Sequence, residues 1–139
     1  MTAAELRYLI ATSEIHEITG VGVKLTEIAL RMGVSKVSVY RAVERLEKNG
    51  CVARDEKNKI VITEYGEKQL ADYMEIIGFV RTQLTRYCDT PDELAYKDAL
   101  GVVCALCNHS REKLAGIISR CGDMADDEAN SSSEAKTEE

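Results

Sequence analysis

The sequence is poor in histidine and proline, and this scarcity narrows the range of functions. Only His16 and His109 occur among 139 residues, and Pro91 is the single proline. Two histidines leave little scope for general acid–base catalysis. The sequence also lacks a phosphate-binding glycine loop, a nucleophile elbow and the metal-binding helix of metalloproteases. We therefore do not expect an enzyme.

Long apolar runs are missing as well. No stretch of about 18 apolar residues is present, so no membrane-spanning helix is expected. The N-terminus has no basic region followed by an apolar run, as a secretory signal would. The five cysteines are an odd number, which argues against a disulfide framework. These features together predict a cytoplasmic protein with reduced thiols.

The net charge of −6 argues at first against a nucleic-acid partner, but the charge is unevenly distributed. Residues 1–63 carry a net charge of +2, residues 64–121 of −2 and residues 122–139 of −6. The acidic excess therefore lies mainly in the C-terminal tail. A mildly basic N-terminal part predicts modest non-specific DNA affinity with a strong dependence on salt.

Residues 25–50 read as two helices joined by a tight turn. The first helix has apolar residues three or four positions apart and ends at Gly33. Ser35 can cap the second helix, in which Val39, Val43 and Leu46 share one face. This pattern is typical of a helix-turn-helix, whose second helix enters the major groove of DNA. The alternative is an ordinary helical hairpin with a solvated charged face.

The residues that follow favour the DNA interpretation. Residues 51–54 and 60–63 read as short strands, and the polar link between them carries Lys57 and Lys59. Such a hairpin is a wing that can lie on a phosphate backbone. Val23 can add a short strand to it, and residues 3–17 form a helix ahead of the motif.

The predicted fold is therefore mainly α with a small β-hairpin wing. We expect a winged helix-turn-helix DNA-binding domain over residues 1–65 and a helical dimerisation and effector region over residues 66–121. Residues 122–139 should form an acidic disordered tail. The side chains expected to meet base edges are Lys36, Val37, Tyr40 and Arg41. Those expected to hold phosphates are Ser35, Ser38, Arg45, Lys57 and Lys59.

The C-terminal half reads as three helices. Thr63 can cap a long helix to about residue 86, whose apolar residues alternate at spacings of three and four. That seam predicts a homodimer interface, although it could also pack within one chain; its members are Leu70, Tyr73, Ile77, Val80 and Leu84. A second helix starts at Pro91 within a capping box over residues 90–93 and runs to about residue 108. Ser110 can cap a third helix that Gly122 ends.

Cysteines near residue 107 form a separate group. Cys104, Cys107 and His109 follow a C-x-x-C-x-H spacing, and Cys88 or His16 could complete a tetrahedral set. Thiolate and imidazole ligands suit zinc, ferrous iron or copper(I) better than manganese. Two alternatives remain: the cysteines fill a helix interface as small apolar residues, or they sense thiol oxidation. Cys51 and Cys121 are expected in the core.

In the order and spacing of its motifs the chain resembles the diphtheria-toxin-repressor family of metal-dependent repressors, especially its short manganese-sensing members. The match covers roughly residues 3–120 and is strongest over residues 23–66. The matching residues are Tyr8-Leu9, Ile28-Ala29, Gly33-Val34-Ser35, Ser38-Val39, Arg45-Leu46, Gly50-Cys51-Val52, Ile62-Thr63 and Gly66.

The resemblance implies a homodimer in which a divalent metal, usually manganese or iron, lies between the winged helix and the helical part. Metal binding would fix the spacing of the two DNA-reading heads and so permit operator binding. The resemblance therefore implies a transition metal as cofactor, with zinc, iron or manganese as candidates, and a DNA operator as partner.

The sequence departs from the family at the metal ligands. An ungapped match puts Arg7 and Ile10 at the carboxylates of the first helix, and Ile77 or Gly78 at a histidine of the long helix. The ligands of the next helix fall on Leu100, Val103 and Cys104. With a one-turn shift they fall instead on Cys104, Cys107, and Asn108 or His109.

Three hypotheses follow from the sequence. The first is a homodimeric winged-helix transcription regulator, expected to act as a repressor, that responds to a transition metal. The second is a winged-helix regulator that responds to thiol oxidation or a small ligand. The third is a winged helix used as a protein-interaction module, which the acidic balance favours.

Overall fold

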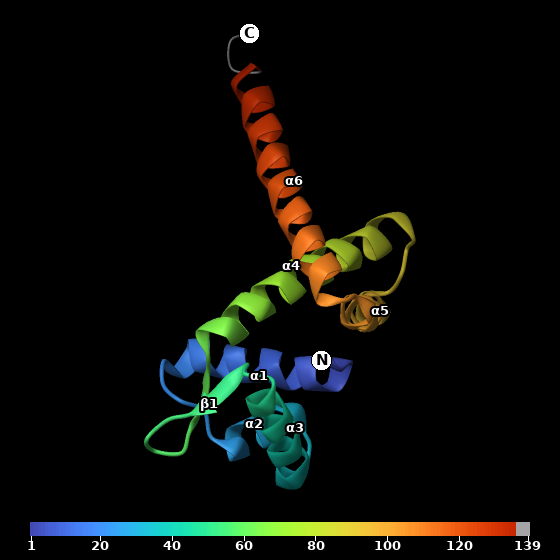
Figure 1. Ribbon diagram of the computed structural model, residues 1–139. Coiled ribbons are helices and arrows are strands. Elements are labelled where there is room, and N and C mark those ends of the chain that lie inside the picture. Colours follow the sequence, from blue (N-terminus) through green and yellow to red (C-terminus); the bar gives the residue numbers. More distant parts are fainter. Residues whose placement is uncertain (136–139) are drawn as a thin grey trace. The chain divides into compact units, whose positions relative to one another are not determined.

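The chain forms two compact units, residues 1–71 and residues 72 onward. Figure 1 shows the computed structural model, which describes the backbone of residues 1–135 and the side chains of residues 1–122. The protein is mainly helical with one small antiparallel hairpin, as the sequence predicted. In the described part of the chain, no helix is long and apolar enough to cross a membrane.

The first unit has the element order of a winged helix-turn-helix. Its elements are α1 (Ala3–Thr19), α2 (Leu25–Met32), α3 (Lys36–Lys48), β1 (Val52–Arg54) and β2 (Ile60–Ile62). The three helices pack on one another, and their largest fully buried aliphatic side chains are Leu6, Leu9, Ile28, Val39, Val43 and Leu46.

Local sequence sets the turn between α2 and α3. Gly33 adopts a left-handed conformation at φ 66°, which glycine accepts without the steric cost that other residues meet. Ser35 then caps α3, because its Oγ accepts a hydrogen bond from the Ser38 backbone N–H at 3.2 Å. Both predictions for this turn are confirmed.

The wing is anchored to the rest of the first unit at its base. β1 and β2 pair with Val52 opposite Ile62 and Arg54 opposite Ile60. Val23 forms an isolated bridge to β2, with its N–H donating to the Ile60 carbonyl at 2.8 Å and its own carbonyl accepting at 2.7 Å. Val23 and Ile60 are both buried, so the predicted extra strand segment is present and lies in the core.

The long helix α4 (Glu64–Tyr87) begins directly after β2, the second strand of the wing. Thr63 caps it as predicted: its Oγ1 accepts from the Gly66 N–H at 3.0 Å and donates to the Gly50 carbonyl at 2.6 Å. A Cβ at Gly66 would lie 2.0 Å from the Cys51 carbonyl oxygen, so only glycine allows this approach. The first unit extends to Ala71, a few residues beyond the predicted boundary at residue 65.

The second unit contains the rest of α4 with α5 (Asp92–Ala105) and α6 (Asn108–Ala135). Arg81 on α4 pairs with the Asp92 carboxylate through both its Nε and its Nη2, and its guanidinium lies 5.2 Å from the Tyr96 ring centroid. These contacts fix the start of α5 against α4. The predicted capping box is wrong, because Pro91 takes the N-cap position and no side chain caps the helix.

Two further helix ends differ from prediction. α6 begins at Asn108 and not after Ser110, because Cys107 takes the position before the helix and its carbonyl accepts from the Arg111 N–H at 3.0 Å. Gly122 does not end α6, which continues to Ala135, since a helix interior tolerates glycine at a modest cost. The predicted disorder of the acidic tail is untested, because residues 136–139 lie outside the described residues, as do the side chains from 123 onward.

The predicted dimer seam of α4 is largely internal. Leu70, Tyr73 and Ile77 are at most 9% exposed within a single chain, so they cannot form the surface of contact with a second chain. Only Val80 and Leu84 of that seam stay half-buried. A heptad repeat shows that a helix has a partner, but it does not say whether the partner belongs to the same chain.

Candidate nucleic-acid interface

α3 presents a polar, basic side to solvent. Val39, Ala42, Val43 and Leu46 face the core, while Val37 is 61% and Tyr40 50% exposed. The other predicted contact residues on or beside α3 are also exposed, namely Ser35, Lys36, Ser38, Arg41 and Arg45. The Ser35 and Ser38 hydroxyls lie 2.9 Å apart and bond to each other in the free protein. A helix that carries lysine, tyrosine and arginine on its open side can read base edges in a major groove.

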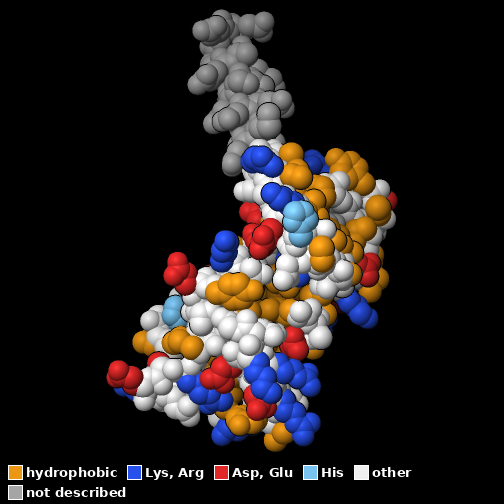
Figure 2. Space-filling view, in the orientation of Figure 1, with side chains coloured by type: hydrophobic (Ala, Val, Ile, Leu, Met, Phe, Trp, Pro, Cys, Tyr) orange, Lys and Arg blue, Asp and Glu red, His pale blue; other side chains and the backbone are white. Residues whose placement is uncertain are grey.

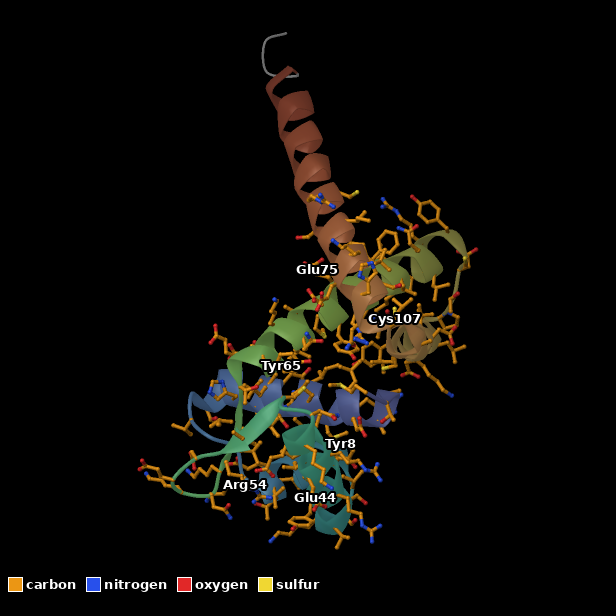
Figure 3. All side chains as sticks on the ribbon, in the orientation of Figure 1. Tyr8, Glu44, Arg54, Tyr65, Glu75 and Cys107 are labelled. Carbon is orange, nitrogen blue, oxygen red and sulfur yellow. The ribbon has the colours of Figure 1, made fainter. Side chains whose placement is uncertain are left out.

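Arg54 connects this helix to the wing. Its guanidinium lies 5.9 Å from the Tyr40 ring centroid, and its Nε lies 3.9 Å from the Glu47 carboxylate. Its Nη1 donates to Asn58 Oδ1 at 3.2 Å. Figure 3 shows Arg54 on the wing and Glu44 on α3, both in the first unit. Sequence reasoning missed Arg54, because only the fold brings it next to Tyr40.

A basic hollow of about 320 Å³ lies between the start of α2, the start of α3 and the wing. None of its lining residues is acidic; they are Lys24, Leu25, Thr26, Lys36, Arg54, Lys57, Asn58 and Lys59. Five cations around one hollow suit a backbone phosphate, which charge-assisted hydrogen bonds hold well. Lys24 was also missed, although the predicted pairing of Val23 with the wing places Lys24 beside it.

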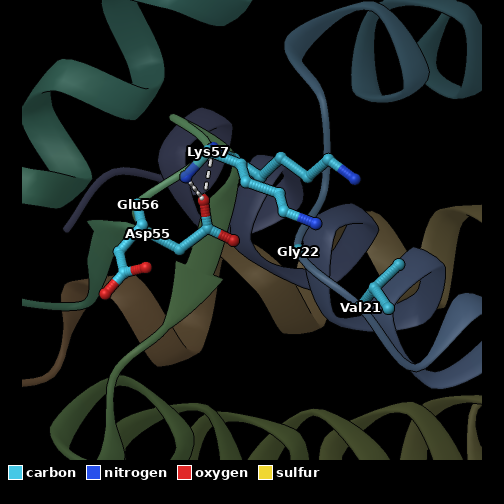
Figure 4. A pocket seen from close by; sticks show the side chains of 6 residues that line it. Val21, Gly22, Asp55, Glu56 and Lys57 are labelled. Carbon is cyan, nitrogen blue, oxygen red and sulfur yellow. Dashed lines mark hydrogen bonds between the residues drawn. The ribbon is translucent and has the colours of Figure 1, made fainter.

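The wing tip has a fixed local conformation. Asp55 Oδ1 accepts from the Lys57 and Lys59 backbone N–H groups, each at 2.9 Å, and Asn58 adopts a left-handed φ of 58°. Figure 4 shows this carboxylate beside a second hollow that the tip forms with Val21 and Gly22. The Asp55 turn therefore fixes the backbone from which the exposed Lys57 and the half-buried Lys59 side chains extend.

Basic side chains thus gather on one part of the first unit. Figure 2 shows Lys and Arg side chains grouped where Figure 1 places α3, with only a few acidic side chains between them. Two of the acidic residues on the exposed side of α3 are Glu44 and Glu47. The structure therefore brings together α3 and the wing lysines, the predicted DNA-contacting elements.

The predicted cysteine site is not assembled. Among residues 1–122, no three His, Cys, Asp or Glu side chains converge to hold a metal ion, so Cys88, Cys104, Cys107 and His109 form no ligand set. Cys51 is buried as expected, and burial raises the pKa of its thiol. Cys121, expected in the core, is exposed, because it lies on the open side of α6.

Cys107 has a distinct environment at the start of α6. Its Sγ lies 3.3 Å from Ser110 Oγ. The pKa of this exposed thiol is lowered, first by the side-chain hydrogen bond with Ser110 and then by the backbone N–H groups of Ser110 and His109. Hydrogen bonds at a helix N-terminus favour a thiolate.

The residues at the family's ligand positions do not fit a divalent metal. Ile10 is 8%, Ile77 2%, Leu100 1% and Val103 0% exposed. Aliphatic side chains offer no lone pair, whereas metal sites need nitrogen, oxygen or sulfur ligands. Cys104 alone among the predicted positions of α5 could donate a ligand. The four aliphatic side chains at these positions are core residues.

Comparison with known proteins supports the resemblance at the level of the fold. The hypothetical protein SSo2273 from Sulfolobus solfataricus matches with a TM-score of 0.65 and 18% identity, over 86% of this chain and 91% of that protein. The manganese regulator SloR matches with a TM-score of 0.67 and 18% identity, over 86% of this chain and 55% of that one.

A third similar structure is ScaR with bound Zn²⁺, at a TM-score of 0.58 and 20% identity, over 83% of this chain and 53% of that one. This chain thus spans about half the length of the two regulators. No family model and no curated protein sequence matches it. At these identities the matches show a shared fold, and the metals named belong to those proteins.

Proposed function

We propose that the chain is a sequence-specific DNA-binding transcription regulator that acts as a homodimer, with repression as the expected outcome. The observation that carries this proposal is the exposed side of α3, with Lys36, Tyr40 and Arg41, next to the cations of the wing. The likeness in fold to metal-dependent transcriptional regulators supports it.

In the proposed complex α3 lies in the major groove. Arg41 donates to guanine and the Val37 methyl groups contact a thymine methyl, while Lys36 and Tyr40 reach neighbouring base edges. Phosphates are held around this helix and under the wing by Ser35, Ser38, Arg45, Lys57 and Lys59. The basic hollow adds Lys24 and Arg54 to that set.

The test separates base reading from phosphate binding. Binding sites are first selected from a pool of random duplexes, and the affinity of Arg41→Ala is then measured on the selected and on scrambled duplexes. Arg41→Ala should lose about 1–3 kcal/mol on the selected site and tolerate any base at one position, because it removes a bidentate contact.

Two controls accompany Arg41→Ala. Lys57→Ala should weaken binding equally on all duplexes and reduce the salt slope by about one, because it removes a phosphate contact. Arg7→Ala removes an exposed charge of α1 outside the interface and should change little. Equal weakening of Arg41→Ala on every duplex would place Arg41 on the backbone.

A second candidate is a winged helix used for protein interaction. Glu44 and Glu47 on the exposed side of α3 favour it, since acidic residues oppose a phosphate backbone. Absent or salt-insensitive binding to random duplex DNA would support this candidate and contradict the first.

The homodimer needs a contact surface other than the buried seam of α4. Among the described side chains of the second unit, six large apolar ones are between 43% and 71% exposed: Met74, Phe79, Tyr87, Leu94, Val102 and Ile117. Figure 2 shows hydrophobic side chains gathered over this unit. Exposed apolar clusters of this kind are typical of interaction surfaces, and we assign this one to the second copy.

A further inference from the structure

A buried cation lies at the corner between α5 and α6. Arg111, in the first turns of α6, is only 4% exposed. Its Nη2 donates to the Leu106 carbonyl at 3.1 Å and its Nη1 to Asn108 Oδ1 at 2.9 Å. The centre of its guanidinium lies 4.2 Å from the Tyr73 ring centroid. One side chain thus contacts α4, the end of α5 and the start of α6.

The electrostatics of α6 alone do not explain this position. A positive charge near a helix N-terminus is unfavourable, and burying a guanidinium removes strong hydration. The corner offsets part of these costs, although the Arg111 Nε is buried without a hydrogen-bond partner. Leu106 lies at the C-terminal end of α5, where carbonyls carry partial negative charge. The Tyr73 ring face adds a further favourable interaction with the cation.

The guanidinium contacts Tyr73 and Leu106, and each of these is one helical turn from a position at which the resemblance implies a metal ligand. Ile77 follows Tyr73 by one turn on α4, and Val103 precedes Leu106 by one turn on α5. Both Ile77 and Val103 are buried and aliphatic. A fixed positive charge one turn away repels a second cation, and the aliphatic side chains provide no ligand to compensate.

We propose that Arg111 is the resident cation of this corner, that it performs the structural task of a divalent metal in the resembling family, and that the chain folds and binds DNA without such a metal. The DNA-binding part of this inference rests on the proposed function. The part concerning the fold of the second unit does not.

Thermal unfolding without DNA tests the metal claim directly. The melting temperature of the wild-type chain should change by no more than about 1 °C with excess EDTA, Mn²⁺ or Zn²⁺, because a ligand that does not bind the native state cannot stabilise it. A clear rise with Mn²⁺ would overturn the proposal. A rise with Zn²⁺ that disappears in Cys104→Ser/Cys107→Ser would overturn it in favour of a thiolate site.

Substitutions test the role of Arg111. Arg111→Met keeps much of the side-chain length without the charge, and its melting temperature should fall by about 4–8 °C. Arg120→Met removes an exposed arginine of the same helix and should lower it by less than about 1 °C. A stability equal to wild type for Arg111→Met would contradict the proposal.

Arg111→Lys serves if the methionine variant does not fold. It keeps the charge but loses the planar two-donor fork, so it should fold with a melting temperature below that of wild type. A melting temperature equal to that of wild type would contradict the role of the fork, and failure of Arg111→Lys to fold would contradict the role of the charge.

Selection from random duplexes, run once with EDTA and once with Mn²⁺, tests the functional part. The same sequence should be enriched in both arms, with affinities within about twofold of each other. Enrichment only with Mn²⁺ would overturn metal independence. Failure to enrich any sequence in either arm would reject the proposed DNA function, while the thermal measurements would still decide the role of Arg111.

Discussion

Cys107 shows how one residue acquires reactivity from its place before a helix. The pKa of its thiol is lowered by the hydrogen bond with Ser110, which raises the share of thiolate at neutral pH. Cys88 and Cys121 are exposed as well and serve as internal references. We expect iodoacetamide to alkylate Cys107 roughly several-fold faster than those two cysteines. Because the pKa is lowered, the advantage should grow as the pH falls below the usual thiol range.

Peptide mass spectrometry after brief alkylation at several pH values measures this prediction. Ser110→Ala removes the strongest of the stabilising hydrogen bonds and should reduce the rate at Cys107 alone. Equal rates at Cys107, Cys88 and Cys121 across the pH range would show that the start of α6 does not activate the thiol.

At the scale of elements, the contact between α4 and the wing depends on Gly66. Gly66→Ala places a Cβ 2.0 Å from the Cys51 carbonyl oxygen, so the start of α4 must move away from β1. We expect a loss of about 1–3 kcal/mol in the free energy of unfolding. Gly78→Ala in the same helix meets nothing within 4 Å and should gain about 0.5–1 kcal/mol.

Urea denaturation of the two variants beside wild type gives both values. Opposite signs for Gly66→Ala and Gly78→Ala are the expected result, because the substitution is the same and only the surroundings differ. A stabilised Gly66→Ala chain would mean that the start of α4 is free to move from the wing at little cost.

The elements that the sequence predicted well are those with local determinants. Gly33 and Ser35 define the turn before α3 through their own backbone and side chain, and the alternation of residues 51–63 defines the wing. The ends that failed, at Ser110 and Gly122, depend on neighbouring turns of helix: Cys107 takes the cap position, and Gly122 is accommodated inside α6.

The candidate site divides in the same way. The exposed side of α3 follows from helical period alone, so Lys36, Tyr40 and Arg41 could be assigned from the sequence. Arg54 and Lys24 join them only through the tertiary fold. Arg111 carries no sequence signal of burial, since arginine on an amphipathic helix is usually exposed.

At the scale of the whole molecule, the second unit should mediate self-association. Phe79→Glu and Val102→Glu each place a charge among exposed apolar side chains, at 44% exposure in both cases, without disturbing the core. We expect each to halve the mass of the wild-type protein measured by light scattering. Each should also weaken binding to a duplex that carries two half-sites, because a monomer can bind only one half-site at a time.

Leu30→Glu is the matched control, since Leu30 is 86% exposed on α2 in the first unit. It should leave the mass unchanged. If all three variants keep the wild-type mass, the exposed apolar residues of the second unit do not form the contact between copies. A monomeric wild-type protein would contradict the proposed homodimer itself.

The paired amides and carbonyls of Val23 and Ile60 have a mechanical consequence. These two hydrogen bonds join the base of the hairpin to the segment that precedes α2. The hairpin and the helix-turn-helix should therefore move as one rigid body. A rigid hairpin loses little conformational entropy when it binds DNA. The interaction energy of the lysines at its tip should therefore contribute almost in full to the affinity. Slow deuterium uptake at the Val23 and Ile60 amides would be the signature of this rigidity.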